Sequence, residues 1–484
     1  VRRVREKLFR HMSSLDINYF EKNKTGVLVA RLTSDMQSLN EFAREGASSV
    51  LTSLLTIFAA TVAVFFVDFQ LSVVAFIILP LLGVATRIFR KHADTAYWAV
   101  REWIGQVLSS LQEGISGVRI IQAYGDESTQ IERFKDVNQS HLDANLTSAK
   151  NIAIYFPFIE ITRVTSIATV IWFGAQRIFE GTLTIGELVA LLFYLNYFFD
   201  PLIQLSFNYD LLRSAGSSMK KVFSILDEKP FLSEKGDISP AVDNEKVIEF
   251  KNVDFSYGRE LVLKDINFVI NKGEKIAIVG ETGAGKSTIA KLVLRFYLAN
   301  EGKVEFFNTD ANEISQQWVR ENVAYVPQES FLFRGTIRDN LIYSDPENIN
   351  LEAELESIGV LSWFDRYENK LDQEVGERGG NISAGERQFV ALLRAVLAKR
   401  QIIVFDEATA NLDIESESSI LEATDQLLSF QTSIVIAHRL ETILNAEKII
   451  VMEEGNLVGF DSHDNLVKNN QTYKELFSAW NLVN

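Results

Sequence analysis

The sequence predicts two parts of different fold class: α-helical transmembrane segments in the first half and an α/β domain with a largely parallel sheet in the second. Three observations support this prediction. Residues 46–67 and 69–86 are two uncharged runs separated only by Asp68. From residue 247 onward, short β-branched runs alternate with helical stretches, as they do in α/β domains. A glycine-rich loop, GETGAGKST, follows one of these runs, KIAIVG.

Length, charge and residue composition limit the number of domains, the classes of partner and the kinds of site that the chain can have. The 484 residues are enough for two to four domains. Residues 1–240 contain 24 basic and 24 acidic residues, whereas residues 241–484 contain 24 and 40. The acidic second half disfavours nucleic acid as a partner. The absence of cysteine excludes disulfides, thiolate metal sites and a cysteine nucleophile, and the five histidines show no HExxH spacing.

The first predicted membrane hairpin consists of helices at about 46–67 and 69–90. At about 1.5 Å per residue, each is long enough to cross a hydrocarbon layer of about 30 Å. Arg87, Arg90 and Lys91 close the second helix, and the positive-inside rule places that end in the cytoplasm. The alternative, two buried helices of a soluble core, is disfavoured because such helices rarely lack charges on every face.

A second pair of membrane helices is predicted at about 153–179 and 184–208. Glu160 and Arg163 interrupt the first helix at i,i+3 spacing, and Asp200 lies in the second. Ionisable residues at membrane depth face water or one another. Glu160 and Arg163 are therefore either a polar patch on a substrate path or a structural ion pair near the aqueous end of the helix. The ion pair is the favoured interpretation.

The remaining segments set the domain boundaries. Residues 91–152 are polar but keep apolar residues at helical spacing, which predicts long helices that continue from the membrane into the cytoplasm. We therefore expect a transmembrane domain over 1–226. Prolines and charges at 227–246 indicate a linker, and the α/β domain follows at 247–484.

The loop at residues 280–288 fits the pattern GxxxxGK[ST] between a predicted strand and a predicted helix. Its glycines allow backbone N–H groups to surround a polyphosphate at a helix N-terminus. Lys286 is expected to reach the β and γ phosphates, and Ser287 to coordinate Mg²⁺. ATP and Mg²⁺ are therefore the expected cofactors. The predicted nucleotide contacts in the loop are Gly280, Glu281, Thr282, Gly283, Ala284, Gly285, Lys286, Ser287 and Thr288.

Two adjacent acids end the apolar run IIVFDE. A nucleotide-binding sheet places metal-binding and water-polarising carboxylates at such a strand end. Asp406 is expected to hold Mg²⁺ through water, and Glu407 to act as the general base or to position the attacking water. In isolation such a pair is more often a solvated turn, but downstream of a phosphate loop it indicates catalysis.

Residues 381–388, NISAGERQ, together with FSYG, VPQES and VIAHR, resemble the nucleotide-binding domain of ATP-binding cassette (ABC) transporters. The resemblance covers nearly all of 247–484. It implies that Tyr257 stacks on adenine, that Gln328 senses Mg²⁺ and the attacking water, and that His438 contacts the γ phosphate. Each residue also has a structural interpretation, as a core aromatic, a turn residue or a packed histidine.

The first half resembles exporters of this family that fuse membrane and ATPase domains in one polypeptide. Residues 23–36 look like the first intracellular loop, 117–127 like the second, and 181–202 like the entry into the last membrane helix. Residues 375–380, VGERGG, resemble an exporter-specific segment that touches these loops. Such half-transporters have six membrane helices. Four are predicted here, so the first two are expected upstream of Val1. The absence of an initiator methionine at the first position agrees with this expectation.

The signature sequence departs from the family pattern, reading ISAGE in place of LSGGQ. The resemblance implies that Ser383 and Gly385 face ATP held by a partner chain, and that Asp413 lines the dimer seam. Ala384 adds a methyl group and Glu386 a negative charge near that ATP, which should weaken the composite site. Because the phosphate loop and catalytic carboxylate are intact, the pattern resembles heterodimeric bacterial exporters. A heterodimer of two half-transporters is therefore favoured over a homodimer.

The resemblance implies ATP-driven export of a small molecule, lipid or peptide by alternating access. It implies a multi-pass protein of the bacterial inner membrane, surrounded by membrane lipid, with a cytoplasmic ATPase domain and no nucleic-acid partner. The alternatives are a soluble ABC-type ATPase acting on nucleic acid or ribosomes, and an ATP-gated channel or regulator. The uncharged runs argue against the soluble ATPase, and Glu407 argues against the channel.

Overall fold

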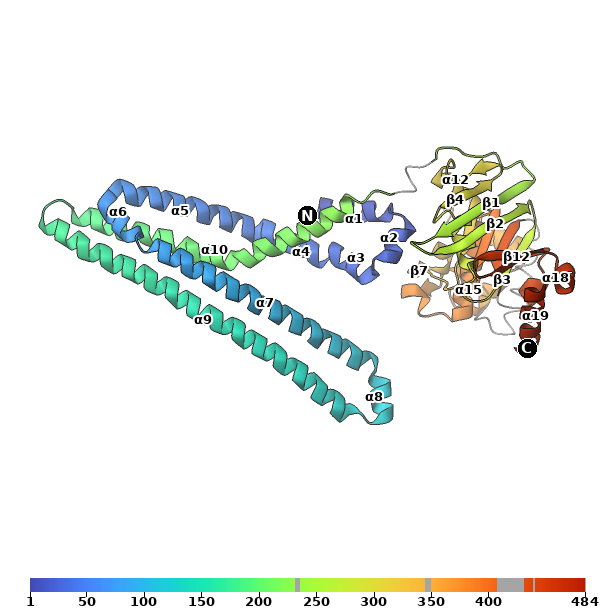
Figure 1. Cartoon of the computed structure of the whole chain (residues 1–484), viewed down its shortest axis with the longest axis horizontal. Helices are drawn as coiled ribbons and strands as arrows, with labels where there is room; N and C mark the ends of the chain where they lie inside the picture. Colours follow the sequence, from blue (N-terminus) through green and yellow to red (C-terminus); the bar gives the residue numbers. More distant parts are fainter. Residues whose placement is uncertain (231–235, 344–349, 407–430, 438–439, 484) are drawn as a thin grey trace. The chain divides into compact units, whose positions relative to one another are not determined.

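The computed structural model describes residues 1–230, 236–343, 350–406, 431–437 and 440–483 (Figure 1). Two compact units divide the chain. The helical unit comprises Val1–Phe9 and Leu28–Ile225, and the α/β unit comprises Arg10–Val27 and Leu226–Asn484. The short segment Arg10–Val27 thus packs with the α/β unit although it lies in the first half of the sequence.

Four long apolar segments account for the predicted membrane helices. Within the described residues, the helices long and apolar enough to cross a membrane are Thr25–Val67, Phe69–Ser116, Glu127–Phe179 and Ile185–Leu205. The prediction of four membrane helices is confirmed. The helices of the first half are α1 (Arg2–Ser13), α2 (Ile17–Lys22), α3 (Thr25–Leu32), α4 (Ser34–Glu41), α5 (Ala47–Val67), α6 (Phe69–Phe76), α7 (Leu79–Ser116), α8 (Val118–Tyr124), α9 (Glu127–Phe179) and α10 (Ile185–Leu226), with a π-helical turn at Phe42–Gly46 between α4 and α5.

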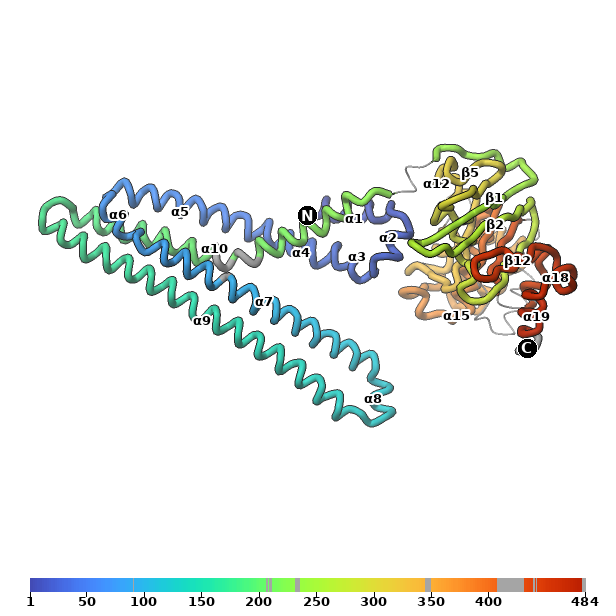
Figure 2. The backbone as a smooth tube through the Cα atoms, in the orientation of Figure 1, coloured from blue at the N-terminus to red at the C-terminus, as the bar shows by residue number. Residues whose placement is uncertain are grey.

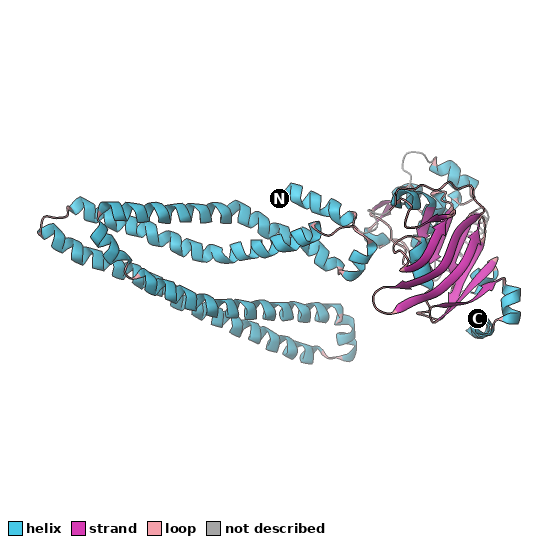
Figure 3. Cartoon of the chain, turned by 45° about the horizontal axis from the view of Figure 1, so that its top comes forward, coloured by secondary structure: helices cyan, strands magenta, loops and turns pink. Residues whose placement is uncertain are grey.

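The helices α7 and α9 extend far beyond their apolar parts and pack side by side (Figures 2 and 3). They cover most of residues 91–152, for which the sequence predicts long helices. A short break at residues 77–78 separates α6 from α7. Pro80 lies in the first turn of α7, where its missing N–H removes no intrahelical hydrogen bond.

Asp68 explains the turn between α5 and α6. It is the N-cap of α6, and its side chain accepts a hydrogen bond from the Leu71 N–H at 2.8 Å. Its second carboxylate oxygen pairs with Arg177 of α9 at 2.6 Å. The single charge between the two uncharged runs therefore both caps a helix and ties the hairpin to α9.

The core of the helical unit is built from α5, α6, α7, α9 and α10. Val64, Leu71, Val170 and Phe199 are among its fully buried side chains. Lipid tails are as apolar as these residues, so close packing rather than hydrophobic burial holds such helices together. Gly174 shows how close the packing is, since a Cβ there would lie 2.6 Å from Leu188 Cδ1.

The α/β unit contains two main sheets (Figure 3). The six-stranded sheet has the order β12-β11-β3-β10-β9-β6 and is parallel except for β12, as predicted. An antiparallel sheet of order β2-β1-β4-β5 accompanies it. The strands are β1 (Lys246–Ser256), β2 (Leu261–Asn271), β3 (Lys275–Gly280), β4 (Glu301–Phe306), β5 (Thr309–Asp310), β6 (Val323–Val326), β7 (Gly335–Thr336), β8 (Glu374–Val375), β9 (Ile402–Asp406), β10 (Thr432–Ile436), β11 (Lys448–Glu453) and β12 (Asn456–Asp461).

The two largest of the three hydrophobic clusters among the described residues of this unit hold its sheets and helices together. One lies between the sheets and α11 (Lys286–Val293), and includes the stacked rings of Phe250 and Phe268, whose centroids are 4.3 Å apart. The other joins the helical part of the unit to β6 and β9 through residues such as Phe389 and Phe405. The helices are α11 (Lys286–Val293), α12 (Gln316–Asn322), α13 (Ile337–Leu341), α14 (Leu351–Ser357), α15 (Ala384–Leu397), α17 (Leu440–Leu444), α18 (His463–Asn469) and α19 (Gln471–Val483).

Candidate nucleotide-binding site

The phosphate loop connects the buried strand β3 to the N-terminus of α11. Gly280 and Gly285 have φ angles of 148° and 101°, a region that favours glycine. A Cβ at Gly280 would lie 2.2 Å from the Met452 carbonyl oxygen, and one at Gly285 would lie 2.6 Å from Leu263 Cδ2. Both positions therefore require glycine, and the loop backbone can turn closely enough to direct N–H groups toward a phosphate.

Lys286 reaches back over this loop. Its side chain is largely buried, with the residue 6% exposed, and its ammonium group donates to the carbonyl oxygens of Gly280 at 2.7 Å and Glu281 at 2.8 Å. Ser287 is exposed at the start of α11, and Thr288 is buried. A cation and a helix N-terminus therefore lie in one short segment, which is the chemistry that binds a polyphosphate. Of the other loop residues, Glu281, Thr282 and Gly283 are exposed and Ala284 is buried.

The carboxyl edge of the parallel sheet brings further predicted residues to the same side of the unit. Asp406 ends β9 and pairs in register with Ile436 of β10, which in turn pairs with Ile278 of β3. Gln328 follows the end of β6, the neighbour of β9. Strands that run in parallel end at one edge, so the phosphate loop, Asp406 and Gln328 share it.

Three predicted site residues, Glu407, His438 and Asp413, lie outside the described residues. Glu407 directly follows the last residue of β9, and His438 is two positions beyond the end of β10. Both strands belong to the sheet that carries the phosphate loop.

Tyr325 is a neighbour of this edge that the sequence reasoning missed. Its phenol donates to Asp406 Oδ2 at 3.5 Å. Burial and the nearby carboxylate of Asp406 raise the pKa of Tyr325 to about 12, so the phenol stays protonated and orients the acid. A tyrosine three residues before Gln328, in the same strand run AYVPQ, is the only sequence signal that could have indicated it.

Tyr257 lies beside the first turn of α11. Its hydroxyl is 3.2 Å from Thr288 Oγ1, and its ring packs edge-on against Tyr297, with centroids 5.0 Å apart. The residue remains 44% exposed, which does not fit a core aromatic. An exposed ring next to the phosphate loop is suited to stacking on a nucleotide base.

A second feature that sequence reasoning missed connects this corner of the α/β unit to α2. Glu21 pairs with Lys291 of α11 at 2.8 Å and accepts a hydrogen bond from the Tyr297 hydroxyl at 2.5 Å. Lys291 also lies 5.2 Å from the centre of the Tyr257 ring. Burial alone would raise the pKa of Glu21, but the hydrogen bonds from Lys291 and Tyr297 outweigh it, and the pKa lies below its usual range.

The signature residues form the N-terminus of α15. Ser383 is the N-cap and makes a capping box with Glu386. The Ser383 N–H donates to Glu386 Oε2 at 2.7 Å, and the Glu386 N–H donates to Ser383 Oγ at 3.2 Å. The Glu386 carboxylate is thus turned onto its own helix, while Ala384 is exposed and Gly385 half-buried. A family-type glutamine at this position could form the same box.

The charge of Glu386 is retained in this arrangement. Burial alone would raise its pKa, but the hydrogen bond from the Ser383 N–H and the guanidinium of Arg366, 4.0 Å away, lower it below the usual range. Glu386 is therefore ionised at neutral pH, at the end of α15 where the signature is exposed.

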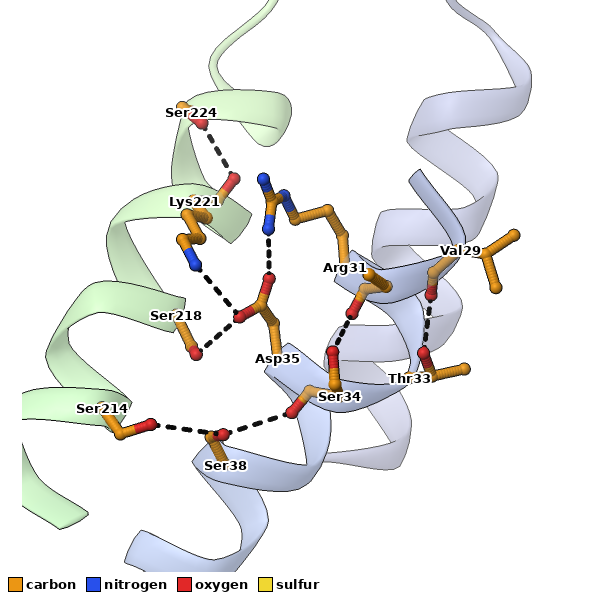
Figure 4. A network of polar contacts seen from close by, with 11 residues as sticks. Val29, Arg31, Thr33, Ser34, Asp35, Ser38, Ser214, Ser218, Lys221 and Ser224 are labelled. Carbon is orange, nitrogen blue, oxygen red and sulfur yellow. Dashed lines mark hydrogen bonds and ion pairs between the residues drawn. The ribbon is translucent and has the colours of Figure 1, made fainter. Parts of the chain in front are cut away.

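A polar network joins two parts of the helical unit (Figure 4). Asp35 of α4 is only 7% exposed and accepts hydrogen bonds from Arg31 at 2.6 Å and from Ser218 of α10 at 2.8 Å. Lys221 of α10 lies 3.7 Å from the same carboxylate. We call these four residues the Asp35 clasp. It links the segment that resembles the first intracellular loop to the C-terminal part of α10.

Comparisons with known proteins agree with this architecture. Residues 1–202 match the family model of the ABC transporter transmembrane region, and residues 263–410 match the model of the ABC transporter. A putative ABC transporter ATP-binding protein, exp8, of Streptococcus pneumoniae is 33% identical over 99% of this chain and 82% of its own length. An ATP-dependent lipid A-core flippase of Desulfotalea psychrophila is 32% identical over 99% and 84%.

The solved structure of a bacterial Atm1-family ABC exporter with ATP bound superimposes with a TM-score of 0.82 at 28% identity. The superposition covers 99% of this chain and 84% of the exporter chain. The chain belongs to the ABC transporter family. It has the half-transporter architecture of an integral membrane exporter, and its ATPase domain uses ATP to drive export. The transmembrane match argues against a soluble ATPase acting on nucleic acid or ribosomes.

Proposed function

We propose that the chain is one half of a heterodimeric exporter of the bacterial inner membrane, and that it works by alternating access. Two ATP molecules are bound and hydrolysed between two facing nucleotide-binding domains. Binding favours the closed dimer because only that state completes both sites, and a ligand shifts an equilibrium by its differential affinity for two states. Hydrolysis then releases the closed state.

The single observation that carries this proposal is the phosphate loop with Lys286 folded over it, at the sheet edge that also holds Asp406 and Gln328. The loop N–H groups and Lys286 bind the β and γ phosphates, and Tyr257 stacks on adenine. His438 contacts the γ phosphate. Each of these groups acts on charge or position rather than by covalent chemistry.

Oxygen donors at this edge fit a magnesium ion. Ser287, Asp406 and Gln328 would hold it, and Mg²⁺ needs only one or two protein ligands because it keeps several waters and binds phosphate oxygens. When bound, the ion neutralises charge on the phosphates. Glu407 positions the attacking water and accepts its proton.

The signature supports the heterodimer. Ser383, Ala384, Gly385 and Glu386 complete the ATP site of the partner, and Asp413 lines the seam. The ionised carboxylate of Glu386 repels phosphate, and the exposed methyl group of Ala384 restricts its approach. This chain therefore supplies a competent catalytic half to one site and a weak signature to the other. The transported substrate belongs to the small molecules, lipids or peptides, and membrane lipid surrounds the helices.

Replacement of the catalytic carboxylate tests this proposal. In the assembled full-length transporter, Glu407→Gln should keep ATP binding and lower steady-state hydrolysis by ~10² or more, the usual loss when a general base is removed. The measurements are nucleotide binding at equilibrium and phosphate release. Glu356→Gln, which makes the same change at an exposed position of α14, is the matched control and should leave both unchanged. Wild-type turnover in Glu407→Gln would remove Glu407 from its role.

A further inference from the structure

Four polar side chains lie near one another on α9 and α10 within segments apolar enough to cross a membrane. Arg163 forms an ion pair with Glu160 on α9 and donates to Asn196 Oδ1 of α10 at 2.8 Å. Asp200 lies one turn beyond Asn196, close enough to Arg163 to interact with its charge. At about 1.5 Å per residue, Asp200 is roughly 22 Å along α10 from Ile185, so a hydrocarbon layer of about 30 Å that begins at Ile185 would include it.

The charges of this group do not balance. Arg163 is engaged by Glu160 and Asn196. Asp200 is exposed, and among the described residues no hydrogen bond or ion pair within 4.0 Å engages its carboxylate. An ionised residue at membrane depth faces water or protein rather than lipid. The exposed side of α10 therefore borders either a water-filled space or another protein segment, and it presents a net negative charge there.

Two exposed aromatic rings lie on the same side of α10. Phe193 is 62% exposed and Tyr197 is 59% exposed. Counted from Phe193, Tyr197 and Asp200 are at i+4 and i+7, so the three side chains share one helix face. We call them the Asp200 face. The faces of aromatic rings attract cations, and a carboxylate adds direct charge attraction. The combination suits an organic cation with an apolar body and repels an anion of the same shape.

We propose that the Asp200 face is a binding site for the transported substrate and that this substrate is a lipophilic organic cation. The inference rests on the proposed export function, because it requires a water-filled path beside α10. It goes beyond that function by fixing the chemical class and the charge of what is carried. Asp200 supplies the countercharge, while Phe193 and Tyr197 supply the apolar and π contacts.

Two probes of equal shape and opposite charge test the proposal on the unmodified protein. The assembled full-length transporter is placed in zwitterionic lipid nanodiscs, and binding of tetraphenylphosphonium and tetraphenylborate is measured by equilibrium dialysis, with partition into empty nanodiscs subtracted. We expect saturable binding of the phosphonium at least roughly tenfold tighter than that of the borate, the effect of one partly desolvated charge pair. Equal affinities, or tighter binding of the borate, would overturn the proposal.

Substitutions then locate the site. Asp200→Asn should weaken phosphonium binding roughly tenfold, whereas Asp200→Glu should retain it. The matched control Glu180→Gln removes the same charge from the exposed end of α9 and should have no effect. An unchanged affinity in Asp200→Asn would contradict the proposal. If that variant instead loses dimer assembly while phosphonium binding persists, Asp200 pairs with a cation of the partner chain, and the proposal also fails.

The dialysis measurement is made without nucleotide, so it does not depend on turnover. Phosphate release from ATP, measured in parallel, reports on the export function itself. A transporter that hydrolyses ATP but does not prefer the phosphonium contradicts only the substrate class. One that binds the phosphonium but hydrolyses no ATP contradicts only the export mechanism.

Discussion

Glu386 combines two effects that its replacement by glutamine would separate. Its carboxylate accepts the Ser383 N–H in a capping box, and its charge stands at the exposed signature. Glutamine forms the same box, so Glu386→Gln removes the charge and keeps the helix cap. The loss of helix stability should be small. Only the attraction between the negative charge of Glu386 and the N-terminus of the helix is lost, and such an attraction is worth about 0.3–1 kcal/mol.

We therefore predict that Ala384→Gly combined with Glu386→Gln speeds ATP hydrolysis at the partner's site. The physical reason is the removal of a methyl group and a like charge beside the phosphates. Phosphate release by the assembled dimer is the measurement, made with the partner's own catalytic site active. The same rate in both proteins would mean that the unusual signature has no energetic consequence.

At the scale of contacts between helices, we predict that disruption of the Asp35 clasp lowers the stability of the protein. Asp35→Asn removes the charge of a buried carboxylate from Arg31, whose side chain is 23% exposed, and from Lys221, whose side chain is 46% exposed. The cost of leaving a buried polar partner unsatisfied is about 1–3 kcal/mol. The thermal unfolding temperature of the assembled protein in nanodiscs should fall accordingly.

Asp94 provides a matched comparison for this prediction. It pairs with Arg213 of α10 at 2.6 Å, and both side chains are about half exposed. Exposed pairs contribute about 0–1 kcal/mol. Asp94→Asn should therefore have a much smaller effect than Asp35→Asn, and equal shifts would show that burial of the clasp is not what makes it stabilising.

The stability of the α/β unit depends on pH through the carboxylate of Glu274. Glu274 accepts hydrogen bonds from the Asn271 N–H at 2.8 Å and from Lys448, the first residue of β11, at 2.6 Å. Burial alone would raise the pKa of Glu274, but these bonds lower it below the ordinary value of 4.5. A carboxylate with a lowered folded-state pKa stabilises the fold above its unfolded pKa, and this stability is lost as the pH falls through the folded pKa.

We therefore expect the contribution of Glu274 to the unfolding temperature to be complete at pH 7 and to be lost as the pH is lowered below 4.5. Glu274→Gln should flatten part of this profile, because the neutral side chain no longer gains from ionisation. Glu356→Gln, at an exposed position, should reproduce the wild-type profile. If all three profiles coincide, the Glu274 contacts contribute nothing that depends on its charge.

Features that depend on neighbouring residues could be predicted from the sequence, whereas contacts between residues far apart in the sequence could not. The four membrane helices and the phosphate loop were predicted because hydropathy and glycine spacing are local properties. The pairing of Glu21 with Lys291 spans 270 positions and that of Asp35 with Ser218 spans 183, so neither could be read from a local pattern. The ion pair of Glu160 and Arg163 was predicted, because i,i+3 spacing on a helix brings side chains together.

On the scale of the whole molecule, composition alone was misleading and its distribution was informative. The averages resemble those of an ordinary soluble protein, with 47% hydrophobic and 23% charged residues. The helical unit has apolar segments that suit lipid, while the acidic surplus belongs to residues 241–484. The helical unit is therefore suited to lipid and the α/β unit to water. The acidic side chains of the α/β unit do not have to be buried in lipid with the apolar helices.

The position of Lys291 has a consequence for how the protein distinguishes an empty site from a filled one. Its ammonium group stands between the exposed ring of Tyr257 and the carboxylate of Glu21. A flat molecule laid on that ring would strip water from the ammonium group, and attraction between opposite charges strengthens as the local dielectric falls. Occupancy at the base would then tighten the hold on α2 without any atom of the bound molecule touching that helix.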